Sequence, residues 1–95
     1  MVLRLTRLRS KPGQMPMLRE IYNAQVIPAI RALTGHHSSH LMEGLTDPDE
    51  ALGWIVWDDA KFANAYVGTG SFAGNMALIR HLLAKDPVIE AFNFI

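Results

Sequence analysis

The sequence predicts one α+β domain, residues 1–95, with an antiparallel sheet whose helices lie on one face. Apolar residues alternate over residues 2–9, as in a strand, and then recur every three to four positions, as in a helix. The segments 51–57 and 88–95 are apolar on both faces, which is typical of buried strands. A chain of 95 residues is too short for two independent cores. The resulting order of elements, βαββαβ, is the ferredoxin-like arrangement.

The first strand is expected at residues 2–9. One face of it carries Leu3 and Leu5, and the other carries Val2, Arg4, Thr6 and Leu8. A long amphipathic helix follows from Gln14 and ends at Gly35. Pro28 removes a backbone hydrogen bond within this helix and clashes with the carbonyl of Ala24, so we expect a kink near the last two turns.

Two more strands are predicted at 36–43 and 51–57, with a turn at Asp47-Pro48 between them. Residues three apart in a regular strand point to opposite faces. If Trp57 faces the helices, we therefore expect Trp54 to face away from them.

Two helical segments and a last strand complete the predicted domain. Asp58 can cap a short helix that runs to Tyr66, and Ser71 can cap the next one after the break at Gly68-Thr69-Gly70. The side chains at helical spacing in this last helix are Phe72, Met76, Ile79 and Leu83. Residues 88–95 are expected to return to the sheet.

Charge and composition exclude several classes of partner. Nine Lys and Arg residues balance nine Asp and Glu residues, so no overall field draws the chain to nucleic acid or to an anionic membrane. The absence of cysteine excludes disulfides and thiolate chemistry. The apolar runs are short and no signal peptide is visible. We expect a cytoplasmic protein with neither nucleic-acid nor membrane partners.

The free face of the sheet predicts an oligomer. The helices can cover only one face, yet the strands at 51–57 and 88–95 are apolar on both. An antiparallel sheet normally carries polar side chains on a face left open to water. We therefore expect a second copy of the chain to pack sheet against sheet, as a homodimer.

Three stretches of the sequence together resemble the antibiotic biosynthesis monooxygenase family of dimeric α+β barrel proteins. They are VLRLTRLRSKPGQ…LREIYNAQVIPAIRAL, the DPDE…IVW hairpin, and AKFANAYVGTGSF before the last helix. The resemblance implies a homodimer with a cavity between sheet and helices in each subunit. The activities it implies range from cofactor-independent oxygenation of polyketide anthrones or quinols to haem degradation, and many members have no assigned activity.

The family motif is only partly present. It has a strand that ends in Glu-x-Trp and a histidine nine positions after the tryptophan. Trp57 matches the tryptophan, but Ile55 stands at the glutamate position and Tyr66 at the histidine position. The haem-degrading branch uses an asparagine, a tryptophan and a histidine where this chain has Thr6, Tyr66 and Met76. The resemblance therefore disfavours haem degradation and implies no cofactor.

Trp57 and Tyr66 are the leading candidates for a ligand site. The Trp57 ring can stack on a flat substrate, and the Tyr66 hydroxyl can bond a phenol or quinone oxygen. The alternative is that both are core residues. Further candidates for the cavity wall, each also compatible with core packing, are Tyr22, Ile55, Phe72 and Met76.

The histidine trio His36, His37 and His40 suggests two roles, a metal site or a source of a base. In a strand, His36 and His40 share a face but stand about 13 Å apart at roughly 3.3 Å per residue, too far for ligand bonds of about 2 Å. We therefore expect no metal site. His37 or His40 can instead reach the cavity as a general base, because imidazole titrates near neutral pH. Exposure of both to water is the alternative.

Two functions follow from the sequence. The first is a cofactor-independent monooxygenase, in which a bound aromatic or quinol-like anion reduces dioxygen and the protein supplies desolvation, orientation and one base. The second is a non-catalytic small-molecule-binding or structural dimeric module, which the replaced glutamate and histidine favour.

Overall fold

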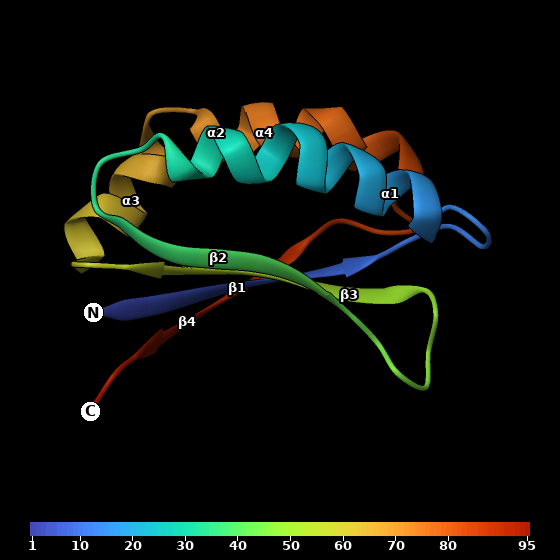
Figure 1. Ribbon diagram of the computed structural model, residues 1–95, viewed down its shortest axis with the longest axis horizontal. Coiled ribbons are helices and arrows are strands. Elements are labelled where there is room, and N and C mark those ends of the chain that lie inside the picture. The colour runs from blue at the N-terminus through green and yellow to red at the C-terminus, as the bar shows by residue number, and fades with distance from the viewer.

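The computed structural model describes residues 1–95 as an antiparallel sheet with a layer of helices (Figure 1). The strands are β1 (Val2–Arg9), β2 (His36–Glu43), β3 (Glu50–Trp57) and β4 (Val88–Asn93), in the spatial order β2-β3-β1-β4. The helical elements are α1 (Met15–Ile21), the π-helical turn η1 (Tyr22–Val26), α2 (Ile27–Arg31), α3 (Ala60–Gly68), α4 (Ser71–Ile79) and the 3-10 turn η2 (Arg80–Leu82). None of these helices has the length and apolarity needed to cross a membrane.

All the helices lie on one side of the sheet, and nothing covers the other side (Figure 1). Every strand pair is antiparallel, with β1 between β3 and β4. The predicted α+β ferredoxin-like arrangement is confirmed.

Strand pairing divides the side chains between the two faces of the sheet. Trp57 pairs with Val2, and Ile55 pairs with Arg4, and residues opposite each other in an antiparallel pair share a face. The helix-side residues of β1 and β3 are Val2, Arg4, Thr6, Leu8, Ala51, Gly53, Ile55 and Trp57. The apolar residues that we call the open face are Leu3, Leu5, Leu52, Trp54 and Val56. Trp54 and Trp57 therefore point to opposite faces, as predicted.

The helix between β1 and β2 accommodates Pro28 through a π turn. The N–H of Ile27 donates to the carbonyl of Tyr22, five residues back. A proline in a regular helix would oppose the carbonyl of Ala24, and the wider turn relieves this conflict. The expected disturbance therefore begins at Tyr22, earlier in the chain than the last two turns.

Two predicted helix caps are wrong by one residue. Asp59, not Asp58, caps α3, and its Oδ1 accepts from the N–H of Lys61 at 2.9 Å. The Asp58 N–H instead donates to the carbonyl of Gly35 at 2.8 Å. The N-cap of α4 is Gly70, not Ser71, and Ser71 is the first residue of the helix. Gly70 has a φ of +88°, a conformation that favours glycine.

The last helix and the last strand are shorter than predicted. After Ile79 the chain tightens into η2, and Leu83 pairs with Ser10 in an isolated bridge. Leu83 stays buried, but it lies outside the helix to which its spacing assigned it. The strand β4 ends at Asn93, two residues before the predicted end.

The hydrophobic core fills the space between the helix layer and the helix-side face. It is a cluster of 16 buried residues that includes Leu18, Ile30, Ile79 and the fully buried Trp57. The helices thus bury the helix-side residues of β3 and the end of β1, which places the interior of the domain on that side.

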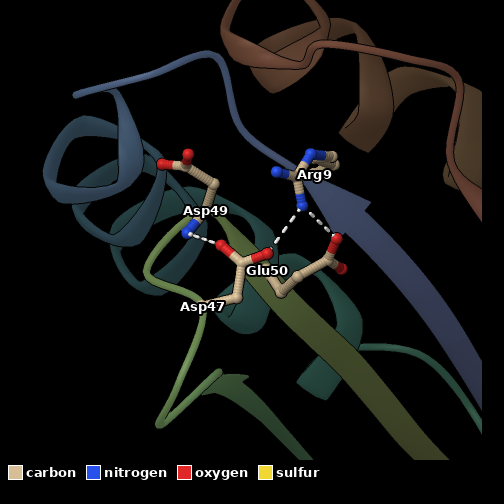
Figure 2. A network of polar contacts seen from close by, with 4 residues as sticks. All are labelled: Arg9, Asp47, Asp49 and Glu50. Atoms are coloured by element: carbon tan, nitrogen blue, oxygen red, sulfur yellow. Dashed lines mark hydrogen bonds and ion pairs between the residues drawn. The ribbon is translucent and has the colours of Figure 1, made fainter.

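An ion-pair network joins the β2–β3 turn to the end of β1 (Figure 2). The Arg9 guanidinium donates to the Asp47 carboxylate at 2.9 Å and to the Glu50 carboxylate. Asp47 also accepts from the N–H of Asp49 at 3.0 Å. The bond from Arg9 lowers the pKa of Asp47, so the pair is ionised at neutral pH.

Candidate functional site

A cavity of about 210 Å³ lies between the segment after α2, the end of β3, and α3. Its walls are mostly apolar. The lining residues are Leu33, Thr34, Trp57, Phe62, Ala65, Tyr66 and Thr69. Two of the predicted site residues, Trp57 and Tyr66, therefore border the same cavity.

A chain of aromatic contacts forms one side of this site. The Trp57 and Tyr66 rings are tilted against each other with centroids 5.5 Å apart. Phe72 meets Tyr66 edge to face at 5.8 Å, and His36 meets Trp57 edge to face at 6.3 Å. Edge-to-face and tilted contacts are favourable between aromatic rings, so the two cavity-lining rings are held from both sides.

The Tyr66 hydroxyl has a buried partner on α4. Asn75 Nδ2 donates to the Tyr66 oxygen at 2.9 Å, and both residues are buried. Burial raises the pKa of Tyr66, and the bond from Asn75 opposes this effect. Tyr66 is therefore a neutral phenol at neutral pH and has a proton to donate.

The Trp57 indole N–H is buried without a hydrogen-bond partner. The side chain is fully buried, so water does not satisfy the group from outside. An indole nitrogen can only donate. The site thus contains an unused donor on a residue that borders the cavity.

His36, which the sequence offered only as a metal ligand, lies beside Trp57 but does not line the cavity. Its Nε2 lies 2.9 Å from the Ser39 hydroxyl, on the helix-side face beside Trp57. Burial lowers the pKa of His36, and the nearby charges of Arg31 and His37 lower it further. His36 is therefore a neutral imidazole at neutral pH.

His37 and His40 do not reach the cavity. A bulge in β2 shifts the register between His36 and Ser38, so His40 pairs with Trp54 and stacks on it with ring centroids 5.3 Å apart. His37 borders a groove on the open face. The expectation that His36 and His40 share a face is wrong, because the extra residue of a bulge inverts the alternation.

Three further candidates are core residues that do not line the cavity: Tyr22, Ile55 and Met76. The Tyr22 hydroxyl lies against Gly53, where an added Cβ would come within 2.2 Å of it. Burial raises the pKa of Tyr22 strongly. Phe72 is half-buried and contacts Tyr66 without lining the cavity.

Asn75 and Phe62 complete the site and were not predicted. Asn75 is a polar residue beside Met76 on the buried stripe of α4, and this position was the available signal. Phe62 precedes Tyr66 by four residues and shares its helix face. A Cβ at Gly35 would lie 2.1 Å from Phe62 Cγ, so only glycine, here with a φ of +84°, admits the Phe62 ring.

No protein-family model and no curated protein sequence matches the chain. Solved structures match it in fold. A protein from Deinococcus radiodurans, provisionally named an antibiotic biosynthesis monooxygenase, has a TM-score of 0.84 at 20% identity, covering 99% of this chain and 92% of that one. A similarly named protein from Nitrosomonas europaea has a TM-score of 0.84 at 14% identity, covering 100% and 99%.

A protein of unknown function, also from Nitrosomonas europaea, has a TM-score of 0.83 at 22% identity, covering 99% of this chain and 88% of that one. At these identities the matches establish the fold, over nearly the whole length of each chain. The resemblance to the antibiotic biosynthesis monooxygenases that the sequence indicated is confirmed at the level of the fold.

Proposed function

We propose that this chain is a cofactor-independent monooxygenase that acts on a small quinol-like aromatic compound. The observation that carries the proposal is the pairing of Trp57 and Tyr66 on the wall of one apolar cavity. Drug-sized ligands occupy pockets of roughly 300–1,000 Å³. The cavity of about 210 Å³ is smaller, which favours a compact one-ring or two-ring substrate.

The proposed reaction needs no electron donor other than the substrate. A quinol and dioxygen give a hydroxyquinone and water, so one oxygen atom enters the product and the other leaves as water. Trp57 would stack on the ring, and the Tyr66 hydroxyl would bond a substrate oxygen. The apolar residues of the wall would shield one side of the reacting anion from water. In this proposal His36 replaces His37 and His40 as the candidate base, because it lies beside Trp57.

Oxygen uptake tests the enzyme proposal. With a panel of benzoquinols and naphthoquinols, we expect the protein to consume oxygen faster than a heat-denatured control. Tyr66→Phe removes the bond to the substrate oxygen and should lower the rate by about ten-fold or more. Tyr22→Phe removes the same atom from a tyrosine outside the cavity and should retain most of the uptake.

Uptake no faster than that of the denatured control would reject the oxygenase. Saturable binding of the same compounds without uptake would then support the second candidate, a non-catalytic binding module. The observation that favours this candidate is that Trp57 and Tyr66 both belong to the core cluster. A cytoplasmic location remains part of either proposal, since a chain without cysteine is compatible with a reducing compartment.

We also propose that the chain forms a homodimer through the open face. A groove of about 560 Å³ runs over this face, and none of its ten lining residues is Lys, Arg, Asp or Glu. Met42 and Phe94 border it and are about half exposed, at 52% each. An apolar surface of this kind, bordered by the Arg7–Glu90 ion pair, is typical of an interface.

Sedimentation velocity tests the dimer. Leu52→Asp puts a charge on the open face, and we expect it to convert a dimer to a monomer. Leu78→Asp makes the same change on α4, outside this groove, and should leave the dimer intact. A wild-type chain that sediments as a monomer at high concentration would reject the interface.

A further inference from the structure

We infer that His37 makes the homodimer sensitive to pH, so that two copies associate at neutral pH and separate when this imidazole takes up a proton. The inference rests on the dimer proposed above and does not depend on the ligand site or on turnover. It assigns a role to a histidine that borders the groove of the open face and lies away from the cavity.

His37 is an exposed residue in an otherwise apolar groove. Of the ten lining residues, eight are hydrophobic and the other two are His37 and Ser38. The Nδ1 atom of His37 lies 3.1 Å from the Ser38 hydroxyl, an uncharged partner that can donate to the ring or accept from it. In the single chain the imidazole is in contact with water, which solvates either of its protonation states.

No carboxylate is placed to neutralise an imidazolium at this position. The charged groups near this end of the sheet are Arg31 and Asp58, which act on His36, and the two ends of the chain (Figure 1). None of them forms an ion pair with His37. A proton on His37 therefore depends on water for its stabilisation.

The groove suits a second copy of this chain, because it presents no charge to itself across a two-fold axis. The groove contains no Lys, Arg, Asp or Glu. In the adjoining groove at the β2–β3 hairpin, Glu43 is paired with Arg19 and Glu50 with Arg9 in the same chain. The groove of a partner copy thus brings apolar surface and no unpaired carboxylate. An imidazolium covered by it would lose water without gaining a counter-charge, whereas a neutral imidazole would lose much less.

His40 is the other imidazole on the open face, and its surroundings differ. It does not line the groove. Its ring stacks on Trp54 with centroids 5.3 Å apart. The face of a tryptophan ring attracts a cation, so a proton on His40 has a favourable contact within the same chain. We therefore assign the pH dependence to His37.

The direction of the effect follows from the exclusion of the proton by the interface. The dimer binds fewer protons than two separate chains. Its stability is therefore present above the titration of a histidine in water, at a pH of about 6.5, and is lost as the pH falls through that value. Each copy contributes one His37, so dissociation takes up two protons. Between pH 7.5 and 5.5, about one unit on either side, these two groups can raise the Kd by at most about 100-fold.

Sedimentation velocity over a dilution series at these two pH values, at constant ionic strength, tests the inference. We expect the Kd of the wild type to be about ten-fold or more higher at the lower pH. His37→Gln keeps a neutral polar side chain and should hold the Kd within about two-fold over the same range. The controls His40→Gln, outside the groove, and His81→Gln, on η2, should keep the wild-type change.

A permanent charge at the same position gives an independent check. His37→Lys should weaken the dimer at the higher pH about as much as acid weakens the wild type, and acid should add little to this loss. Near-UV circular dichroism at the lower pH tests whether the separated chains stay folded. If acid unfolds the wild type, the comparison of His37→Lys with His37→Gln at the higher pH still decides the result.

Three results would overturn the inference: a Kd that does not change with pH, tighter association at the lower pH, or a wild-type pH dependence in His37→Gln. In each of these cases the dimer stands and only its control by His37 is wrong. A wild-type chain that is monomeric at the higher pH would reject both the dimer and its control by pH.

Discussion

Two tryptophans of β3 have opposite environments on the two faces of the sheet. Trp57 on the helix-side face is fully buried and packs between His36 and Tyr66, and its N–H has no partner. Trp54 on the open face is only partly buried, stacks on His40, and donates its N–H to the Met42 sulfur at 2.9 Å. The two tryptophans lie three positions apart in one strand.

This difference indicates that the helix-side face contributes mainly to stability and the open face to association. On the helix-side face the helices bury the side chains of β3, and the Trp57 N–H is left unsatisfied beside a small cavity. On the open face the polar group is satisfied, but the apolar surface around it is not covered by the chain (Figure 1). The proposed ligand site therefore lies on the first face, and the proposed dimer interface lies on the second.

The largest expected effect is the difference between two tryptophan substitutions. Trp57→Ala removes a fully buried ring and should lower the free energy of unfolding by about 3–5 kcal/mol, because the core cannot close the space. Trp54→Ala should cost less than half as much at protein concentrations where the chain is monomeric. Urea denaturation of the two variants measures both values. Equal losses would show that the two faces do not differ in this way.

The second prediction concerns the close approach of the helix layer to the sheet at Gly53. Gly53→Ala would bring a methyl group within 2.2 Å of the Tyr22 oxygen and 2.9 Å of Tyr22 Cζ. We expect a loss of about 1–3 kcal/mol from overpacking. Tyr22→Phe should recover part of this loss when the two changes are combined, because it removes the nearer atom. Thermal or urea denaturation of the single and double variants gives the coupling.

Gly74→Ala is the matched control for Gly53→Ala. Gly74 lies within α4, and a Cβ there would meet nothing within 4 Å. We expect this substitution to stabilise the protein by about 0.5–1 kcal/mol, because alanine favours the helix. If Gly53→Ala were equally harmless, the contact between Tyr22 and the sheet would not restrict the core.

The fold and the assignment of the two tryptophans were predictable because they depend on local periodicity. Alternation in β1 and β3 separates the faces, and the helical repeat identifies the covering layer. Trp57 and Tyr66 were also predicted together, since the resemblance places both at motif positions. These features need no knowledge of contacts between distant segments.

The polar part of the site was not predictable in this way. The bulge after His36 places His36 and His40 on opposite faces of the sheet. No residue in HHSSHLME indicates that one position of the strand is unpaired. The bond from Asn75 to Tyr66 joins two helices, so only the tertiary structure brings the groups together. A hydrophobic stripe predicts that Asn75 is buried, but it does not predict its partner.

The smallest effect concerns His36, whose pKa is lowered in the folded chain by burial and by Arg31. An unfolded histidine has a pKa of about 6.5, so the unfolded state binds the proton more readily than the folded state. The stability that the neutral imidazole provides is present above this value and is lost as the pH falls through it toward the folded pKa. The slope cannot exceed about 1.4 kcal/mol per pH unit for one proton. We expect urea denaturation between pH 7.5 and 5.5, about one unit either side of the unfolded pKa, to give a shallower slope for His36→Gln than for the wild type. A slope for His36→Gln equal to that of the wild type would show that burial of His36 does not contribute to the pH dependence.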